Sequence, residues 1–413
     1  MVRKYSKIIY LIIYKFLLEI IFVKDIAPFN WGYKGLEVNF NFENYCISWI
    51  AYFVFTSLYI TDKGKWVNYN FRDFIYLFLW FIPLTSGIIL YGLGTLDSLY
   101  FVYFCIFYLF LHFWKIFFEH IDLKLNININ DTIKKYIVLL LILLLSISVF
   151  YVFITCNIKF YFDDLENVYS QRSYFKKLNI PIIIKYILGS GLFINIFFII
   201  YSFYMKKWYY LIFGLFVQYC LFSIAADKIV LFSVIIIFIF ILISDKLEFY
   251  KFLKLALIGL LFITVYSSYM PCSVPVSYLR RILFIPNLLS YNYYDYFQNH
   301  IPIYLKINQD LYSNLPYLIA EIYHNKPSMA ATNGLIGDAI SNLGNLGIYI
   351  YPFILNLYFA IILMFSKNIN SKFVVGIAFL VVLVLQDSFF TTSLLSHGLL
   401  FVIIMFFLFP DKF

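Results

Sequence analysis

The chain has 413 residues, of which 63% are hydrophobic and only 13% are charged, and its mean hydropathy is +0.86. Soluble domains are roughly half apolar and about a quarter charged, so this composition excludes an ordinary soluble protein. The formal net charge of +9 could indicate a nucleic-acid partner, but its distribution along the chain argues against one. The apolar runs have the length of membrane-spanning helices rather than the alternation of barrel strands, so we expect an all-α polytopic membrane protein.

The first apolar run, IIYLIIYKFLLEIIFV, follows the N-terminal MVRKYSK. It has no small-residue cleavage site and is interrupted by Lys15 and Glu19, so we interpret it as a retained first span. These two residues are four positions apart, should share one helix face and should partly neutralise each other. Together with this run, the sequence predicts about 12 transmembrane helices in one integral membrane domain, 1–413. The further spans lie at about 45–60, 74–91, 99–118, 136–156, 182–203, 209–224, 229–243, 251–267, 346–365, 373–386 and 394–408. The segment 209–243 could be two short spans or one broken region.

Lysine and arginine residues give the predicted orientation. The set of loops that includes the N-terminus and 115–135 holds 18 of the 31 basic residues, and the opposite set holds 12 in about twice as many residues. Loops rich in Lys and Arg stay in the cytoplasm, so both termini are predicted to be cytoplasmic. The long segment between the ninth and tenth spans, 268–345, is then an extracytoplasmic loop. The positive charge is mostly a topology signal, and no nucleic-acid partner is expected.

Basic residues on the predicted outer side are exceptions to this rule. Arg280 and Arg281 begin the polar part of the long loop, and a guanidinium fork suits two-point contact with a phosphate. The alternative is contact with anionic headgroups or with a loop acid such as Asp295. Lys228 lies between two apolar spans in SIAADKIVLF and could also bind substrate. It could instead pair with the adjacent Asp227 or extend toward the membrane surface.

Four glycines occur at the end of the loop, in TNGLIGDAISNLGNLG, at positions 334, 337, 344 and 347. On a helix, each pair spaced by three would lie on a common face and let another backbone approach closely. Asn333 is a candidate N-cap for this helix. Asp338 and Asn342, at i and i+4, should face the same way.

Candidate general bases for a substrate hydroxyl are His300 and Asp338. His300 follows the aromatic run YNYYDYF, whose rings could stack on a sugar, and a histidine suits proton transfer near neutral pH. Asp338 lies on the glycine-lined helix. Each could instead be structural, His300 by ending a helix and Asp338 by bonding backbone amides. His324 is interpreted as a solvated loop residue. The five cysteines form no C-x-x-C pair, and no metal site is predicted.

Several segments of the second half resemble the Wzy-type oligosaccharide repeat-unit polymerases of bacteria, which make O-antigen and capsule. They are RRILFIPNLLSYNYYDYFQNH, NLPYLIAEIYH, TNGLIGDAISNLGNLGIYIYPFILNL and DSFFTTSLLSHGLL, with SIAADKIVLF at the place of a basic segment common in that family. The resemblance covers roughly residues 205–400, and the first 200 residues match only as a hydrophobic pattern.

This resemblance implies a polymerase in the bacterial inner membrane. It would join repeat units linked to undecaprenyl diphosphate at the outer membrane face, by glycosyl transfer without a metal or cofactor. Its substrate-binding residues would be Arg280, Arg281, Lys228, Asp295, Asn333 and Asn342. A chain-length regulator and a flippase of the same pathway would be its protein partners, and the bilayer its surroundings.

Two other functions remain open at this point. An O-antigen ligase has a similar architecture and uses the same donor with a lipid A–core acceptor. A lipid-linked oligosaccharide flippase is also a bundle of many spans, but it typically has short loops, which disfavours it here. The sugars and the linkage are not predicted by the sequence.

Overall fold

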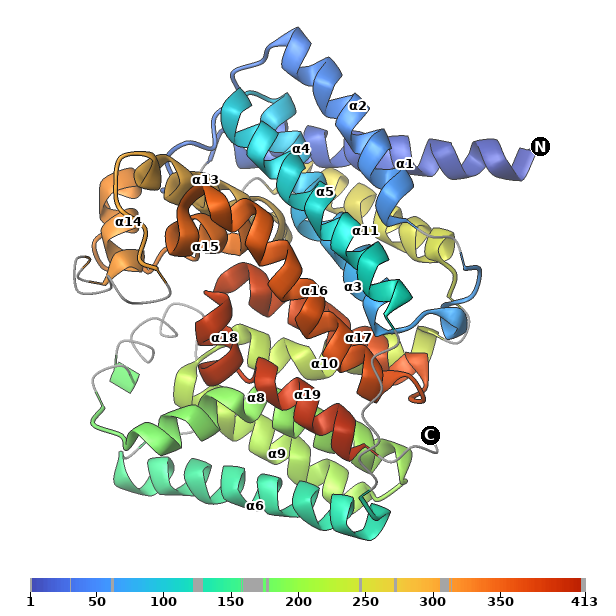
Figure 1. The fold of residues 1–413 in the computed structure, drawn as a ribbon, viewed down its shortest axis with the longest axis vertical. Helices are drawn as coiled ribbons and strands as arrows, with labels where there is room; N and C mark the ends of the chain where they lie inside the picture. Colours follow the sequence, from blue (N-terminus) through green and yellow to red (C-terminus); the bar gives the residue numbers. More distant parts are fainter. Residues whose placement is uncertain are drawn as a thin grey trace. The chain divides into compact units, whose positions relative to one another are not determined.

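A computed structural model describes residues 2–29, 31–60, 63–121, 129–156, 158, 174–175, 178–244, 247–270, 273–304, 312 and 314–409 (Figure 1). Regular structure in these ranges is almost entirely helical, as the sequence predicts. The chain divides into two compact units. The first comprises 1–122, 246–360 and 382–390, and the second comprises 123–245, 361–381 and 391–413.

The helices of the first unit come mainly from two separate parts of the chain, 1–122 and 246–360. In chain order they are α1 (Val2–Ile21), α2 (Phe42–Tyr59), α3 (Phe71–Leu79), α4 (Thr85–Gly92), α5 (Ser98–His120), α11 (Phe249–Tyr269), α12 (Val274–Leu279), α13 (Ile285–Gln298), α14 (Leu315–His324), α15 (Gly334–Leu343) and the first part of α16 (Gly347–Ser366). Helix α1 contacts α11, α2 contacts α4, and α13 contacts α15. Segments distant in sequence therefore form one core.

The second unit contains α6 (Asp131–Thr155), α8 (Ile182–Tyr204), α9 (Trp208–Ala225) and α10 (Lys228–Ile243). It also contains most of α17 (Ser371–Asp387), most of α18 (Phe390–Ser396) and α19 (Leu399–Leu408). Helices α6, α8 and α9 pack against one another, as Figure 1 also shows. The segment 209–243 forms two helices, separated at Ala226, whose φ is +51°.

Several helices are suited to a lipid environment. Seven helices among the described residues are long and apolar enough to cross a membrane, or up to eight if the bent pair α18–α19 is one span. They are Phe71–Gly92, Ser98–His120, Asp131–Thr155, Ile182–Tyr204, Trp208–Ala225, Phe249–Tyr269 and Gly334–Ser366. Helix α10 is apolar but shorter. These helices are compatible with a polytopic membrane protein, whereas the sequence predicts 12 spans.

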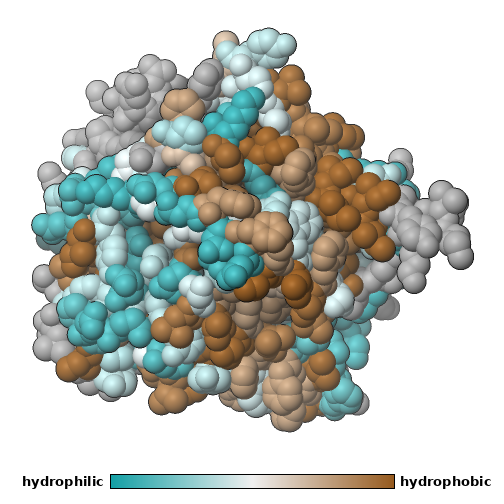
Figure 2. Space-filling view, turned by 90° about the horizontal axis from the view of Figure 1, so that it is seen from above, coloured by the Kyte–Doolittle hydropathy of each residue, from teal (hydrophilic) through white to brown (hydrophobic). Residues whose placement is uncertain are grey.

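Large apolar side chains also reach the surface along single helix faces. On α11, Leu255, Ile258, Phe262 and Val265 are each at least half exposed, at spacings of three and four residues. Figure 2 shows hydrophobic residues at the surface over much of the face that it presents. Monomeric soluble proteins rarely expose apolar patches of this extent. The exposed faces therefore fit contact with lipid.

The segment 268–345, predicted as a loop, is largely helical where it is described, because it carries α12 to α15. The predicted close approach at its glycines is confirmed. A Cβ on Gly337 would lie 3.1 Å from the Cα of Ser290 on α13. The Ser290 hydroxyl accepts from the Gly337 N–H at 2.9 Å and donates to the Asn333 carbonyl at 2.7 Å. Because this one side chain of α13 bonds the backbone of the α15 segment at two points, the two helices are held as a pair.

We expect Gly337→Leu to lower the free energy of unfolding by about 1–3 kcal/mol, because the new side chain would overpack the contact with Ser290. Gly259→Leu on α11 is the matched control, since nothing lies within 4 Å of its Cβ position. Thermal unfolding of both purified variants in detergent measures the difference. Equal melting temperatures for the two variants would contradict the close α13–α15 contact.

Candidate functional site

Arg280 and Arg281 lie in a π-helical turn, Arg280–Phe284, that joins α12 to α13. Pro286 follows this turn and has no N–H to donate to the carbonyl four residues before it. The backbone instead closes a wider ring, in which the Ile285 N–H donates to the Arg280 carbonyl. Such π turns occur frequently at functional sites. The turn presents two adjacent guanidinium groups at the start of α13.

Aromatic side chains from the segment 31–33 surround this arginine pair. Arg280 is buried, and its guanidinium carbon lies 4.5 Å from the ring centre of Trp31 and 5.1 Å from that of Tyr33. The exposed Arg281 donates from Nη1 to the Tyr33 hydroxyl at 2.7 Å. Cation–π contacts stabilise a partly desolvated guanidinium. Both arginines are therefore oriented by Tyr33.

His324 and Lys326 complete this group, which we call the Tyr33 cluster (Trp31, Tyr33, Arg280, Arg281, His324 and Lys326). The His324 ring meets Tyr33 edge to face at 5.3 Å, and the Lys326 ammonium lies 5.5 Å from the Tyr33 ring centre. His324 is buried at the end of α14, so its interpretation as a solvated loop residue is wrong. The reason is that His324, the last residue of α14, packs against Tyr33, and the sequence around His324 does not indicate this distant contact.

The environment of His324 keeps its ring neutral. Burial, together with the positive charges of Lys326 and Lys34, lowers the pKa of His324 to about 4. Asn292 lies 3.0 Å from Nε2 and donates to it when Nδ1 carries the proton. A protonated ring would set an N–H at Nε2 against the amide hydrogens of Asn292. The positive charge of the Tyr33 cluster at neutral pH therefore comes from its two arginines and its lysine and not from His324.

This pKa predicts a pH dependence of stability. In the unfolded chain the histidine pKa is about 6.5, so the unfolded state binds more protons between pH 6.5 and pH 4. Stability from neutral His324 is complete above about pH 6.5 and is lost as pH falls toward 4. We expect a loss of about 2 to 3 kcal/mol across this range. The melting temperature of the purified protein at pH 7 and pH 4.5 measures it.

His324→Gln should flatten this pH dependence, because glutamine does not titrate. His120→Gln is the matched control, since His120 is exposed and bonds only the carbonyl of Ile116 among the contacts described for it. If His324→Gln and His120→Gln show the same acid destabilisation as the native chain, the neutral buried state of His324 is wrong.

Asp338 is buried on α15 and acts as a hydrogen-bond acceptor. Its Oδ1 accepts from Asn342 Nδ2 at 2.7 Å and lies 3.4 Å from the Tyr351 hydroxyl. Its Oδ2 accepts from the backbone N–H of Phe390 at 2.6 Å. The predicted facing of Asp338 and Asn342 is confirmed. The carboxyl group joins α15, α16 and the start of α18 within the first unit, which suits a structural role.

Asn333 occupies the N-cap position of α15, as predicted, but its side chain makes no capping hydrogen bond. Its φ is −102° and the next residue, Gly334, has φ +61°, so the chain enters the helix through a left-handed residue. The Asn333 side chain is buried, and the backbone carbonyl of Asn333 accepts a hydrogen bond from the Ser290 hydroxyl. A small pocket beside this junction is lined by Ser290, Gly334, Pro83, Tyr108, Pro286, Asn287, Leu335, Ile336 and Gln386.

We expect Asp338→Asn to destabilise the protein by about 1–3 kcal/mol, because an amide NH₂ would face one of the donors that the carboxylate now accepts from. Asp295→Asn makes the same chemical change at an exposed position, where the acid accepts from the Tyr323 hydroxyl at 2.6 Å. Its effect should be within about 0.5 kcal/mol. A fully stable Asp338→Asn variant would show that the carboxylate is not a structural acceptor.

His300 and Asp295 lie on the exposed side of α13 and the turn after it. His300 is exposed and stacks on Tyr296, with ring centres 3.8 Å apart. Its Nδ1 is 2.7 Å from the Tyr296 carbonyl. A carbonyl only accepts, so Nδ1 donates to it, and Nε2 is the acceptor nitrogen of the neutral ring. Of the two candidate bases, His300 is the accessible one.

Lys228 begins α10 in the second unit, directly after Asp227. All other predicted site residues lie in the first unit, where Arg280 and Arg281 adjoin the start of α13, and Asp295 and His300 its end. Within the described ranges, no group of three or more His, Cys, Asp or Glu side chains could hold a metal ion. The residues that the sequence did not identify are Trp31, Tyr33, His324 and Lys326. Their signal in the sequence was limited to WGYKG, in which Trp31 and Tyr33 lie next to one basic residue, Lys34.

No family model matches this sequence, and comparisons with curated proteins and with solved structures give no match.

Proposed function

We propose that the protein polymerises oligosaccharide repeat units carried on undecaprenyl diphosphate. The proposal includes the predicted topology, with about 12 spans in a bacterial inner membrane, cytoplasmic termini and 268–345 on the outer side. It is supported by the resemblance of the second half of the sequence to the Wzy-type polymerases. It is also supported by apolar helices of membrane-spanning length in both units.

The observation that carries this proposal is the pair of guanidinium groups in the Tyr33 cluster. Arg280 is buried against two aromatic rings, whereas Arg281 is exposed and held by the Tyr33 hydroxyl. Arginine forks bind phosphate oxygens through two parallel hydrogen bonds, and fixed forks lose little entropy on binding. In the proposed reaction these groups stabilise the diphosphate as negative charge develops on it.

In the same reaction, His300 would accept the proton of the acceptor hydroxyl at Nε2. The hydroxyl oxygen forms a bond to the anomeric carbon of the donor sugar, and the bond from that carbon to the diphosphate oxygen breaks. The electron pair leaves with the diphosphate, and the proton remains on His300. Because the arginines adjoin the start of α13 and His300 follows its end, this step requires the two ends of the site to approach one another around the bound substrate. His300 suits this role better than Asp338, whose two oxygens already accept from neighbouring groups.

We expect Arg280→Ala and Arg281→Ala each to lower polymerisation by about ten- to a hundredfold, because each removes charge-assisted hydrogen bonds to the diphosphate. Arg→Lys should rescue only partly, since an ammonium cannot form the fork. His300→Gln should lower the rate by about 10²–10⁴-fold. The measurement is glycan chain length, made with purified protein and lipid-linked repeat units.

Lys24→Ala is the control for these substitutions, because Lys24 is an exposed cation of the first unit that bonds Ser268 at 2.6 Å. Native activity in both arginine variants, at normal protein levels, would exclude the arginine pair as the diphosphate site. Transfer of glycan only to a lipid A–core acceptor would identify a ligase instead. Movement of the lipid-linked unit across vesicles without any transfer would identify a flippase.

A further inference from the structure

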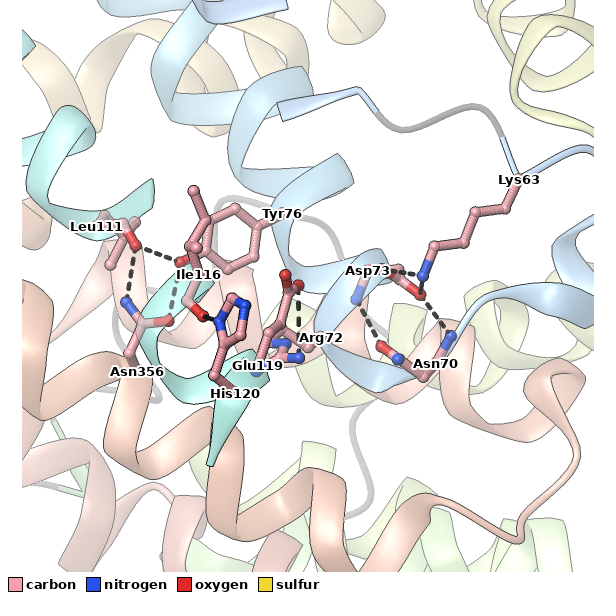
Figure 3. A network of polar contacts seen from close by, with 10 residues as sticks. All are labelled: Lys63, Asn70, Arg72, Asp73, Tyr76, Leu111, Ile116, Glu119, His120 and Asn356. Atoms are coloured by element: carbon pink, nitrogen blue, oxygen red, sulfur yellow. Dashed lines mark hydrogen bonds and ion pairs between the residues drawn. The ribbon is translucent and has the colours of Figure 1, made fainter. Parts of the chain in front are cut away.

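A second group of basic side chains lies where α3 begins and α5 ends, apart from the Tyr33 cluster. It contains Arg72, Lys63, Asp73 and Glu119, which Figure 3 draws, and in addition Lys115. All five belong to the first unit. The helices that carry Arg72 and Lys115, Phe71–Gly92 and Ser98–His120, are both apolar and long enough to cross a membrane. This group therefore lies at the ends of two candidate spans.

Arg72 is buried with most of its donors unused. Only 6% of the residue is exposed, and its Nε and Nη1 atoms have no hydrogen-bond partner among the residues that the structure describes. Its one ionic contact among those described is from Nη2 to Glu119 Oε1, at 3.4 Å, and the Glu119 side chain is 40% exposed. Leaving buried charged donors unsatisfied is costly. The guanidinium fork is therefore positioned for an oxygen-rich anion.

Lys115 supplies a second buried cation beside Arg72. It is 4% exposed, and its ammonium lies 4.7 Å from the ring centre of Tyr76. The Tyr76 ring is fixed by its hydroxyl, which contacts the Leu111 carbonyl at 2.6 Å and Asn356 Oδ1 at 2.9 Å. Figure 3 shows Arg72 and Glu119 between this Tyr76 network and the Lys63–Asp73 pair. Arg72 thus contacts Glu119 of α5, and Lys115 contacts Tyr76 of α3. Asn356 of α16 in turn contacts the Tyr76 hydroxyl.

The nearby acids do not balance this charge. Asp73 is bonded by Lys63 at 2.7 and 2.8 Å, and it also accepts from the backbone N–H of Asn70 as part of the capping box of α3. Among the described residues, the three cations Arg72, Lys115 and Lys63 lie near two carboxylates, those of Asp73 and Glu119, so this described group has one more positive than negative charge. A phosphate diester carries one negative charge and presents two oxygens to a guanidinium fork.

We propose that Arg72 and Lys115 bind the phosphate of an anionic ligand, and that its source is the headgroup of an anionic phospholipid at the membrane surface. A lipid phosphate would satisfy the unused Arg72 donors, neutralise the excess charge and sit where the two apolar helices end. Basic pockets between spans are a known mode of headgroup recognition. This inference is independent of the polymerase proposal, because it involves none of the residues placed in that site.

The test measures lipid binding to the purified full chain. The protein is returned to vesicles of phosphatidylcholine alone or of equal parts phosphatidylcholine and phosphatidylglycerol, and retained lipid is identified by native mass spectrometry. A parallel arm adds inorganic phosphate to protein in phosphatidylcholine vesicles. The variants are Lys115→Gln and Arg72→Lys, which keeps the charge but removes the fork. Lys251→Gln, which removes an exposed cation paired with Glu248 at 3.2 Å, is the matched control.

We expect selective retention of phosphatidylglycerol by the native chain and by Lys251→Gln, and about a ten- to hundredfold loss of affinity in the two site variants. If inorganic phosphate binds at these residues and the lipid has no effect, the phosphate site stands but its lipid source is wrong. Equal retention of both lipids, or native binding in both site variants, overturns the proposal. Melting temperatures near the native value exclude misfolding as the cause of a loss.

Discussion

The Ser290 hydroxyl joins α13 to α15, and the arrangement of the candidate site depends on this contact. The hydroxyl accepts from Gly337 and donates to Asn333, so it fixes both the separation and the register of the two helices. Asp338, on the same helix as Gly337, accepts from the backbone N–H of Phe390, so α15 is also joined to the start of α18. A side chain at residue 337 would separate the two backbones, because a Cβ there would lie 3.1 Å from the Cα of Ser290.

Buried cations in this apolar chain are stabilised in different ways, and the differences distinguish structural from functional positions. Lys15 contacts Glu19 directly and also lies 4.0 Å from the Trp49 ring centre, which is a closed local arrangement. Arg280 uses two aromatic rings and adjoins an exposed arginine. Arg72 has one long ionic contact and unused donors. Of the three, Lys15 has a direct carboxylate partner in a short contact, whereas the described ionic contact of Arg72 is longer, at 3.4 Å.

The sequence predicted those contacts that depend on helix periodicity. The helical class, the Lys15–Glu19 pair, the Asp338–Asn342 pair and the close approach at Gly337 all follow from spacings of three or four residues within one element. The Tyr33 cluster could not be predicted in this way, because its contacts join segments far apart in the chain. Arg281 and Tyr33 are separated by 248 residues, and no pattern in a single sequence indicates that two such distant residues are in contact. His324 was misassigned for the same reason, since its burial depends on a residue in the segment before α2.

The choice between the two candidate bases also depends on information that only the structure contains. The sequence favours Asp338 by its place in the segment that resembles the polymerases and His300 by its chemistry, so it leaves the choice open. The structure distinguishes the two residues by the hydrogen bonds that their acceptor atoms already accept. Both Asp338 oxygens accept hydrogen bonds from protein groups, so taking a proton from a substrate would first require one of those bonds to break. In the exposed His300, Nδ1 faces the Tyr296 carbonyl, so Nε2 is the acceptor nitrogen of the neutral ring. Stacking on Tyr296 also restricts the ring to one plane, so a hydroxyl approaching Nε2 would meet an oriented lone pair rather than a rotating side chain. Of the two residues, His300 is therefore the accessible acceptor, whereas Asp338 joins α15 to Tyr351 and Phe390.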